Sequence, residues 1–317
     1  MARRAPSALS ALALTATLAA ALTATLTAVG GARATAAPPP PDTPVSSDGR
    51  VGPTAPAAGV GRATAGFAGT GDPADAEGVR PAAPRPGVPD GAPDGLAAQS
   101  IIPPDGRTRV TDTTTYPASA DVQVTFTKPN GSAGWCTGWL YASNAVATAG
   151  HCAHSGGSGG AWNTNFAVHP GRDGGSSPFG SCGVTSAHSV TGWTLNANPE
   201  YDYAGLELDC AVGTATGWYG MSWTTASLDG TAVGSSGYPQ DKPAGTQWST
   251  SSSISASYTR QLAYHLDTVG GQDGSVVRAA GCSTVCGIAV HAYGLGDHNR
   301  GTRITEAAFA NYQAWKL

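Results

Sequence analysis

The uneven distribution of cysteine and aromatic residues constrains the fold of this chain most strongly. All six cysteines, eight tryptophans and ten tyrosines follow residue 99. Residues 38–99 instead hold 13 of the 23 prolines and one aromatic residue, Phe67. Such a segment cannot bury enough apolar surface to offset the entropy lost on ordering. We therefore expect a globular domain over 100–317, long enough for a real core, and a disordered linker or a removable propeptide over 38–99.

The first 37 residues are predicted to be a signal peptide. Arg3 and Arg4 precede a run rich in Ala, Leu and Thr, which ends in the small-residue pattern Ala34-Thr35-Ala36. A membrane anchor is the alternative, since the run is long enough to span a bilayer. Its Thr and Ala content and its small-residue exit favour cleavage, so the mature protein is expected to be secreted and free of the membrane.

The charge of the chain indicates which binding partners to expect, and its cysteine content indicates disulfides. Residues 100–317 carry 10 Lys and Arg against 14 Asp and Glu, with no basic patch, so no nucleic-acid partner is expected. Six cysteines in an exported chain predict disulfides, with 15 arithmetically distinct pairings. The sequence contains no recognisable cofactor motif, and we expect a monomer that needs no cofactor.

Period-two alternation of apolar residues predicts an all-β domain. Apolar residues occupy every second position from Val122 to Phe126, just before the turn signal Pro129-Asn130-Gly131. Residues 203–208 and 287–291 are further candidate strands between clusters of Gly, Ser, Thr and Asn. Short strands at such spacing are typical of a sandwich or a barrel.

The end of the chain departs from this pattern. Ile304, Phe309, Tyr312 and Trp315 approximate one helical face, and Thr305 is placed to cap the helix. We expect a C-terminal helix docked on the β core.

One glycine-rich stretch, Thr268 to Val276, has the composition of a reactive turn. Gly270, Gly271 and Gly274 surround Asp273. Glycine permits positive φ and close approach of a substrate. Successive amides in such a turn can point the same way and stabilise a developing oxyanion.

A second stretch places His151 at the end of the predicted strand 145–149. A bridge between Cys152 and Cys136 would fix the histidine backbone. A hydrogen-bonded structural histidine is the alternative. A metal site with Cys152 and His154 is a third interpretation, which the absence of a second cluster at zinc spacing disfavours.

The third stretch contains Asp202 between Tyr201 and Tyr203, just before a predicted strand. A buried carboxylate that accepts from one ring nitrogen fixes the tautomer of an imidazole and stabilises its protonated form. An exposed aspartate in a turn is the alternative.

The order His151, Asp202 and glycine-rich turn resembles that of chymotrypsin-like serine proteases. The stretches 100–102 (SII), 107–110 (RTRV), 114–117 (TTYP) and 299–304 (NRGTRI) resemble the bacterial glutamyl endopeptidases. This resemblance covers essentially all of 100–317 and none of the leader.

The resemblance implies two packed six-stranded antiparallel β-barrels with a site between them. It implies His151 as the general base, Asp202 as its orienting acid, and the amides of Gly271 and Asp273 as the oxyanion hole. It also implies a mature chain that starts near Ser100, after cleavage of the bond that precedes it.

The resemblance further implies peptide substrates with Glu before the scissile bond. By position, Thr268 and His291 would contact that Glu, since a histidine can donate to a carboxylate or carry a charge for it. A hydrogen-bonded strand histidine is the alternative. The remaining cysteines are expected to pair as Cys182–Cys210 and Cys282–Cys286.

The chain departs from the family at its most critical position. The family's turn reads GGQSGSP, with the nucleophilic serine where this chain has Asp273 and a proline where it has Val276. Ser275 is a candidate substitute nucleophile, displaced by roughly 6–7 Å. Asp273 would instead lie beside His151 as a built-in anion, and two flanking carboxylates should raise the histidine pKa.

Three functions follow from these observations. The first is a secreted glutamyl-type serine endopeptidase. The second is an inactive pseudoprotease that binds acidic peptides in the cleft. The third is a β-rich carbohydrate binder, which leaves the His151 stretch and the glycine-rich turn unexplained.

Overall fold

The computed structural model of the protein describes residues 37–50, 61–81 and 100–316. The described residues from 39 onward belong to one compact unit, which contains every strand and helix named below. The predicted signal peptide lies almost entirely outside the described residues. Among the described helices, none has the length and apolar character needed to cross a membrane.

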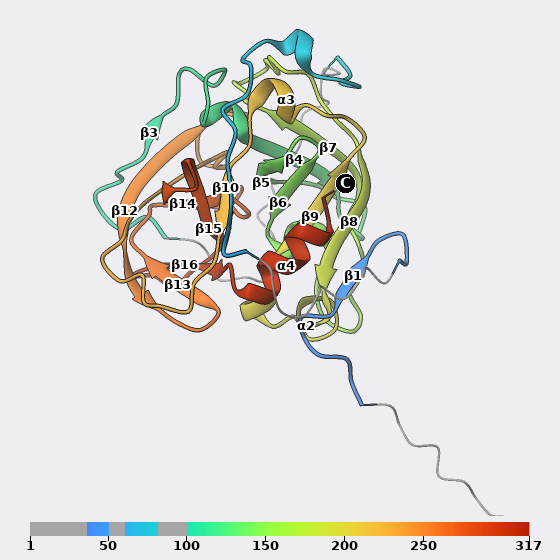
Figure 1. Ribbon diagram of the computed structural model, residues 1–317, viewed down its shortest axis with the longest axis vertical. Helices are drawn as coiled ribbons and strands as arrows, with labels where there is room; N and C mark the ends of the chain where they lie inside the picture. Colours follow the sequence, from blue (N-terminus) through green and yellow to red (C-terminus); the bar gives the residue numbers. More distant parts are fainter. Residues whose placement is uncertain (1–36, 51–60, 82–99, 317) are drawn as a thin grey trace, which may run out of the picture. The chain divides into compact units, whose positions relative to one another are not determined.

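The first sheet has seven strands in the order β1-β8-β9-β6-β5-β4-β7, all paired antiparallel (Figure 1). Its strands are β1 (Pro44–Ser46), β4 (Asp121–Thr127), β5 (Ala133–Ala142), β6 (Ala145–Thr148), β7 (Thr164–Pro170), β8 (Val184–Val190) and β9 (Ala204–Leu208). This sheet is a half-barrel, because the outer edge of β8 pairs with β1. A single bridge between Val168 and Cys182 links β7 to the segment before β8. The closed barrel that the resemblance implied is therefore open on this side.

The second sheet contains a closed barrel of six strands. The closing pair is β14–β15, which completes the order β14-β11-β12-β13-β16-β15. Its strands are β11 (Ala232–Gly237), β12 (Trp248–Ser257), β13 (Gln261–Tyr264), β14 (Val276–Gly281), β15 (Thr284–Gly294) and β16 (Asn299–Arg303). Three short strands attach outside it: β10 (Gly220–Ser222) on β15, β2 (Ala63–Thr64) on β10, and β3 (Thr108–Arg109) on β12. The predicted all-β class is confirmed.

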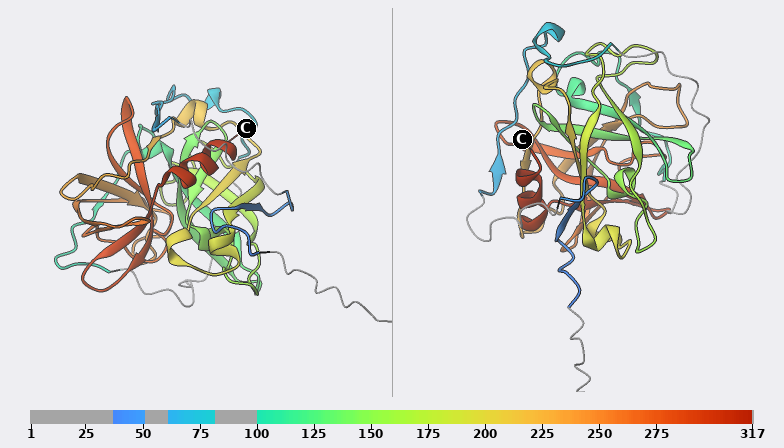
Figure 2. Two further views of the ribbon diagram at one scale, coloured as in Figure 1. Left: turned by 60° about the horizontal axis from the view of Figure 1, so that its bottom comes forward. Right: turned by 90° about the vertical axis from the view of Figure 1, so that its right-hand side faces the viewer.

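Short helices lie between these strands and, in one case, after the last of them. They are η1 (Pro73–Asp75), η2 (Ala118–Ala120), α1 (Gly150–Ala153), α2 (Thr191–Thr194), η3 (Pro199–Tyr201), α3 (Gly213–Thr216) and α4 (Glu306–Ala314). The C-terminal helix α4 starts as predicted, because the Thr305 side chain accepts a hydrogen bond from the Ala308 amide at 3.2 Å. It lies against the first sheet (Figure 2), where Trp315 stacks on His188 of β8 with ring centroids 5.6 Å apart.

The local predictions within 100–317 are confirmed. The alternating residues 122–126 lie in β4, and the turn at 129–131 joins β4 to β5. Residues 204–208 form β9, and 287–291 lie within β15. The disulfides are Cys136–Cys152, Cys182–Cys210 and Cys282–Cys286, as expected.

The leader differs from its expected disorder wherever the structure describes it. Strand β1 pairs with β8 of the first sheet, and β2 pairs with β10 beside the second. The leader buries little apolar surface, and its order comes from main-chain hydrogen bonds to strand edges that need partners. Composition carries no information about such distant edges, so the expectation of disorder could not take them into account.

Candidate active site

The position of His151 is set by strand β6 and one disulfide. β6 ends at Thr148, and α1 then begins at Gly150. A Cβ at Gly150 would lie 2.8 Å from the Asp202 carboxylate and 2.9 Å from the Trp193 ring, so only glycine fits. Cys152, which follows His151 directly, forms a disulfide with Cys136 of β5 and ties α1 to that strand.

Asp202 holds the His151 backbone and ring at once. Its carboxylate is fully buried and accepts from the His151 amide at 2.7 Å through Oδ1. Its Oδ2 lies 2.7 Å from His151 Nδ1 and also accepts from the Tyr293 hydroxyl. The contact with Nδ1 holds a proton on that nitrogen and directs Nε2 away from Asp202.

Two residues of the second barrel also form hydrogen bonds to Asp202. Tyr293 lies on β15, and Thr302 of β16 donates to the Asp202 carbonyl at 3.0 Å. The sequence reasoning missed both residues. The pairing of β15 with β16 shifts register between His291 and Tyr293, so strand alternation in the sequence could not place Tyr293.

Asp273 faces His151 from the glycine-rich turn. Its Oδ1 lies 3.5 Å from His151 Nε2, an ion-pair distance that is longer than a typical hydrogen bond. Its side chain is 4% exposed. The Thr137 amide donates to the Asp273 carbonyl at 2.8 Å, which ties the turn to β5 of the first sheet.

The turn takes the backbone form that its glycines predict. Gly271 has φ +92° and Gly274 has φ +86°. A Cβ at Gly271 would lie 2.6 Å from both the Trp135 indole nitrogen and the Tyr238 carbonyl. The structure therefore requires glycine at the position where one oxyanion-hole amide is predicted.

Buried Arg107 supports the base of this turn. Its guanidinium pairs with Asp105 at 2.9 Å and with Asp241 at 2.6 Å, and lies 3.4 Å from the Gln272 side-chain oxygen. The same oxygen accepts from the Val269 amide at 3.0 Å. The sequence reasoning gave Arg107 no such role, because its partners lie far away in the chain.

The two carboxylates determine the charge of His151. Burial alone would lower its pKa, but the charge and hydrogen bond of Asp202, followed by those of Asp273, raise the pKa to about 10. The predicted direction is confirmed. His151 is therefore protonated at pH 7.

His291 is buried in β15 beside this cluster. Its Nδ1 lies 2.8 Å from the Tyr264 hydroxyl, and its Nε2 has no hydrogen-bond partner among the described residues. Burial lowers its pKa to about 4, although the nearby Asp273 charge opposes that shift. If Tyr264 donates to Nδ1, the neutral ring carries its proton on Nε2.

Thr268, at the other end of the turn, is also buried. Its hydroxyl has no hydrogen-bond partner within the part of the chain that the structure describes. Two buried polar groups without a hydrogen-bond partner among the described residues thus lie next to the turn.

The Ser275 hydroxyl is bonded to Ser235 rather than to His151. Its hydroxyl is buried and forms a hydrogen bond with the Ser235 hydroxyl at 2.9 Å, inside the second barrel. Its carbonyl accepts from the His291 amide at 2.9 Å. The side chain is committed to the barrel interior, which disfavours Ser275 as a nucleophile.

The described residues contain one group with metal-ligand proximity, Cys136, His151 and Cys152. Both sulfur atoms belong to a disulfide, so neither can act as a thiolate ligand.

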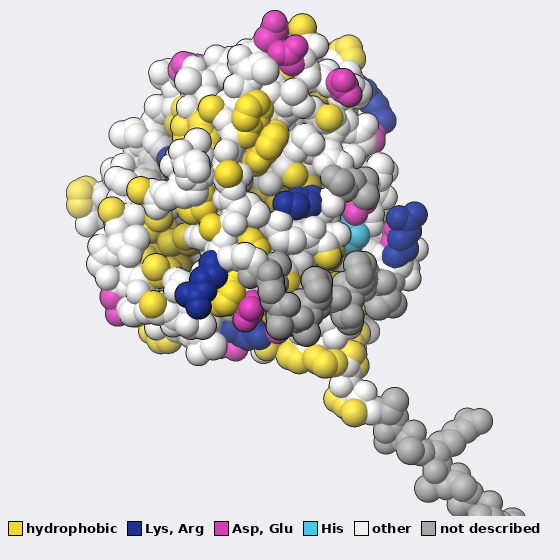
Figure 3. Space-filling model, in the orientation of Figure 1, with side chains coloured by type: hydrophobic (Ala, Val, Ile, Leu, Met, Phe, Trp, Pro, Cys, Tyr) yellow, Lys and Arg dark blue, Asp and Glu magenta, His cyan; other side chains and the backbone are white. Residues whose placement is uncertain are grey.

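On the face in Figure 3, Lys and Arg side chains are scattered singly rather than gathered in one patch.

Comparisons with known proteins agree with this geometry. Residues 109–300 match the sequence family described as Trypsin. The chain is 46% identical over 226 residues to a glutamyl endopeptidase of Bacillus licheniformis, which covers 69% of each protein. It is 40% identical to an "Extracellular metalloprotease" of Bacillus subtilis, over 69% of this chain and 71% of that protein.

Solved structures share the fold. A structure of Glu endopeptidase in complex with MPD matches with a TM-score of 0.61 and 30% identity, over 68% of this chain and 99% of that one. The protease Anisep from Arthrobacter nicotinovorans matches with a TM-score of 0.58 and 22% identity, over 66% of this chain and 99% of that one.

Proposed function

The chain belongs to the trypsin family of serine proteases, and on that basis we propose that it is a secreted, glutamyl-endopeptidase-like protein that binds acidic peptides without cleaving them by the serine mechanism. The observation that carries this proposal is the position of Asp273, 3.5 Å from His151 Nε2, where the family has its nucleophile. Secretion is supported by the leader sequence and by the extracellular relative.

The serine mechanism needs a hydroxyl that attacks and a neutral base that removes its proton. Asp273 offers a carboxylate in place of the hydroxyl. His151, with a pKa near 10, already holds its proton at pH 7. Loss of the serine costs on the order of 10⁶ in turnover, because the catalytic residues act as a unit.

The Asp273 carboxylate does not replace the serine as a nucleophile. If Asp273 attacked a peptide carbonyl, the Asp273 Oδ–carbon bond would form and the C–N bond would have to break to give an anhydride. The intermediate would instead expel the carboxylate, because an amine is a far poorer leaving group. Attack by Asp273 would therefore return the intact peptide.

Binding does not depend on the nucleophile. His291 Nε2 and the Thr268 hydroxyl are buried and have no partner among the described residues. A substrate carboxylate could accept from both, and hydrogen bonds to a charged acceptor are the stronger kind. We propose that these two groups select Glu in the cleft.

Peptide cleavage tests this function. The natural chain and Asp273→Ser are incubated with matched peptides that differ only in Glu or Lys before the scissile bond. We expect the serine variant alone to cleave, after Glu. Cleavage by the natural chain would refute the proposal. Cleavage by neither, with tight binding of the Glu peptide by both, would support binding as the function and identify Val276 or the pocket as a further change.

A further inference from the structure

The described leader residues, 39–50 and 61–81, are here called the strap. At its first end the strap adds a strand to the half-barrel. β1 pairs with β8 in the register Pro44↔Val190 to Ser46↔His188. Ser47 extends this pairing, because its amide donates to the Ala187 carbonyl at 2.8 Å and its hydroxyl accepts from the Ala187 amide at 3.0 Å.

Further along, the strap attaches beside the closed barrel. β2 pairs with β10, which itself pairs with β15. The Gly66 amide donates to the Cys282 carbonyl at 3.0 Å. Phe67 and Trp218 exchange two main-chain hydrogen bonds, at 2.9 and 2.8 Å, and their ring centroids lie 4.6 Å apart. Figure 1 shows this part of the strap passing α3 and running beside β10.

Two glycines show how closely the strap and the domain fit. Gly69 of the strap has φ +76°, and a Cβ there would collide with the Ala215 carbonyl and the Gly217 amide. Gly217 of the domain has φ +78°, and a Cβ there would collide with the Phe67 carbonyl. Each glycine makes room for the other backbone, so this contact depends on both sequences.

A third contact lies where the two barrels meet. The Asp42 carboxylate pairs with both terminal nitrogens of Arg260, at 3.0 and 2.5 Å. Arg260 lies between β12 and β13 of the closed barrel, and its guanidinium is 4.1 Å from the ring centroid of Tyr201. Tyr201 immediately precedes Asp202 of the candidate active site. The strap therefore reaches the junction that holds the site.

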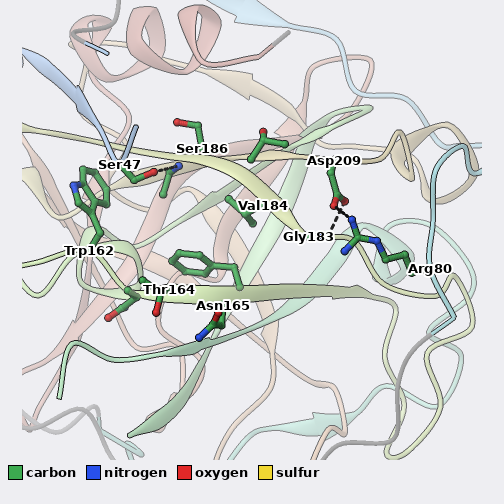
Figure 4. A pocket seen from close by; sticks show the side chains of 13 residues that line it. Ser47, Arg80, Trp162, Thr164, Asn165, Gly183, Val184, Ser186 and Asp209 are labelled. Atoms are coloured by element: carbon green, nitrogen blue, oxygen red, sulfur yellow. Dashed lines mark hydrogen bonds and ion pairs between the residues drawn. The ribbon is translucent and has the colours of Figure 1, made fainter. Parts of the chain in front are cut away.

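The strap also borders the open side of the half-barrel. A cavity of about 490 Å³ lies there, lined by β7, β8, Ser47 and Arg80 (Figure 4). Arg80 pairs with Asp209 through its side chain and exchanges main-chain hydrogen bonds with Ser181 at 3.0 and 2.9 Å. Strap residues thus flank this opening from two separate points of the sequence.

From these contacts we propose that the strap stays bound after cleavage before Ser100, as a second, non-covalent chain that clamps the two barrels together. Every contact described above lies on the N-terminal side of residue 82, so that cleavage breaks none of them. Contacts to both barrels through one chain reinforce each other, because the second contact forms at a high effective concentration. The partner of this surface is therefore the protein's own leader.

The test uses the full chain with a recognition sequence for a site-specific protease inserted between residues 82 and 99. After cutting, gel filtration at micromolar concentration and native mass spectrometry follow the fragment. We expect the strap to elute with the domain and to leave only under denaturing conditions. Separation of the two under native conditions would overturn the proposal.

Matched variants locate the contact. Gly69→Ala should raise the dissociation constant of the cut strap by roughly tenfold or more, because the new Cβ has no room. Gly71→Ala is the control, since Gly71 has nearly the same φ, +77°, and nothing within 4 Å of an added Cβ. Equal dissociation constants for the two variants would show that the cut strap is not held by this contact and would contradict the proposal.

A second pair of variants decides the question if Gly69→Ala fails to fold. Asp42→Asn should speed release of the cut strap, because it removes the ion pair with Arg260. Asp48→Asn is the control, since Asp48 pairs with Arg50 within the strap itself. Identical release from these two variants would also overturn the proposal. None of these measurements depends on peptide binding or cleavage.

Discussion

The Nε2 atom of His151 lies 3.5 Å from the Asp273 Oδ1 atom, and its Nδ1 lies 2.7 Å from the Asp202 Oδ2 atom. One imidazole is thus placed between two buried carboxylates. From the resemblance of the glycine-rich turn, we propose that Asp273 occupies the position that carries the attacking hydroxyl in the trypsin family. Here a negative charge stands in its place and stabilises the protonated ring.

The first prediction concerns the pKa of His151. The natural chain should titrate near pH 10, and Asp273→Asn should lower this pKa, because it removes one of the two charges. NMR titration of the His151 ring protons measures both values. Asp297→Asn is the control, since it removes an equal charge beside another histidine, His298. The Asp297 side chain is 86% exposed. An unchanged His151 pKa in Asp273→Asn would show that Asp273 does not act on the ring.

The second prediction concerns stability against pH. The folded pKa of His151, about 10, is higher than the ordinary value of about 6.5 expected in the unfolded chain. Its contribution to stability is therefore complete below about pH 6.5 and is lost as the pH rises through 10. Urea unfolding at pH 7 and pH 10 should show a smaller loss of unfolding free energy for Asp273→Asn than for the natural chain. Equal losses in the two proteins would contradict this linkage.

The third prediction concerns recognition of Glu. His291→Phe keeps a ring but removes the donor, and it should weaken binding of a Glu peptide by roughly tenfold or more relative to the matched Gln peptide. Thr268→Val should act in the same direction, whereas Thr268→Ser keeps the hydroxyl and should retain the preference. Calorimetric titration with the two peptides gives the ratio. If His291→Phe leaves that ratio unchanged, His291 is only a structural residue of β15.

The fourth prediction concerns the cap of α4. Thr305→Ala should lower the unfolding free energy by about 1 kcal/mol, because the Ala308 amide loses its acceptor. Thr305→Ser keeps the oxygen and should cost much less. Thermal unfolding of both variants measures the difference. If Thr305→Ser lowers the unfolding free energy as much as Thr305→Ala does, the effect belongs to the threonine methyl group instead.

The sequence predicted the site largely through local patterns. His151 at a strand end, Asp202 between two tyrosines, and three glycines around Asp273 are short stretches, and their family resemblance supplied the order. The disulfide pairs could be predicted because the two cysteines of each pair lie close together in the sequence, on either side of one short segment. The predicted alternation placed β4, β9 and β15 correctly for the same reason.

Features that depend on distant contacts could not be predicted. The strap is ordered by the edges of β8 and β10, which lie more than a hundred residues away in the chain. Arg107 and Tyr293 act on the site only because the fold brings Gln272 and Asp202 to them. The leader is rich in Pro and has one aromatic residue, Phe67, and main-chain hydrogen bonds pair its described parts with those edges.

Labelling with a fluorophosphonate tests the central claim most directly, because this reagent forms a covalent bond only with an activated serine hydroxyl. The natural chain and Asp273→Ser are treated alike, and peptide mass spectrometry locates the label. We predict that the natural chain stays unlabelled and that the variant is labelled at position 273. Label on the natural chain, above all at Ser275, would contradict the account, since it would reveal a working nucleophile where the structure shows a side chain bonded to Ser235.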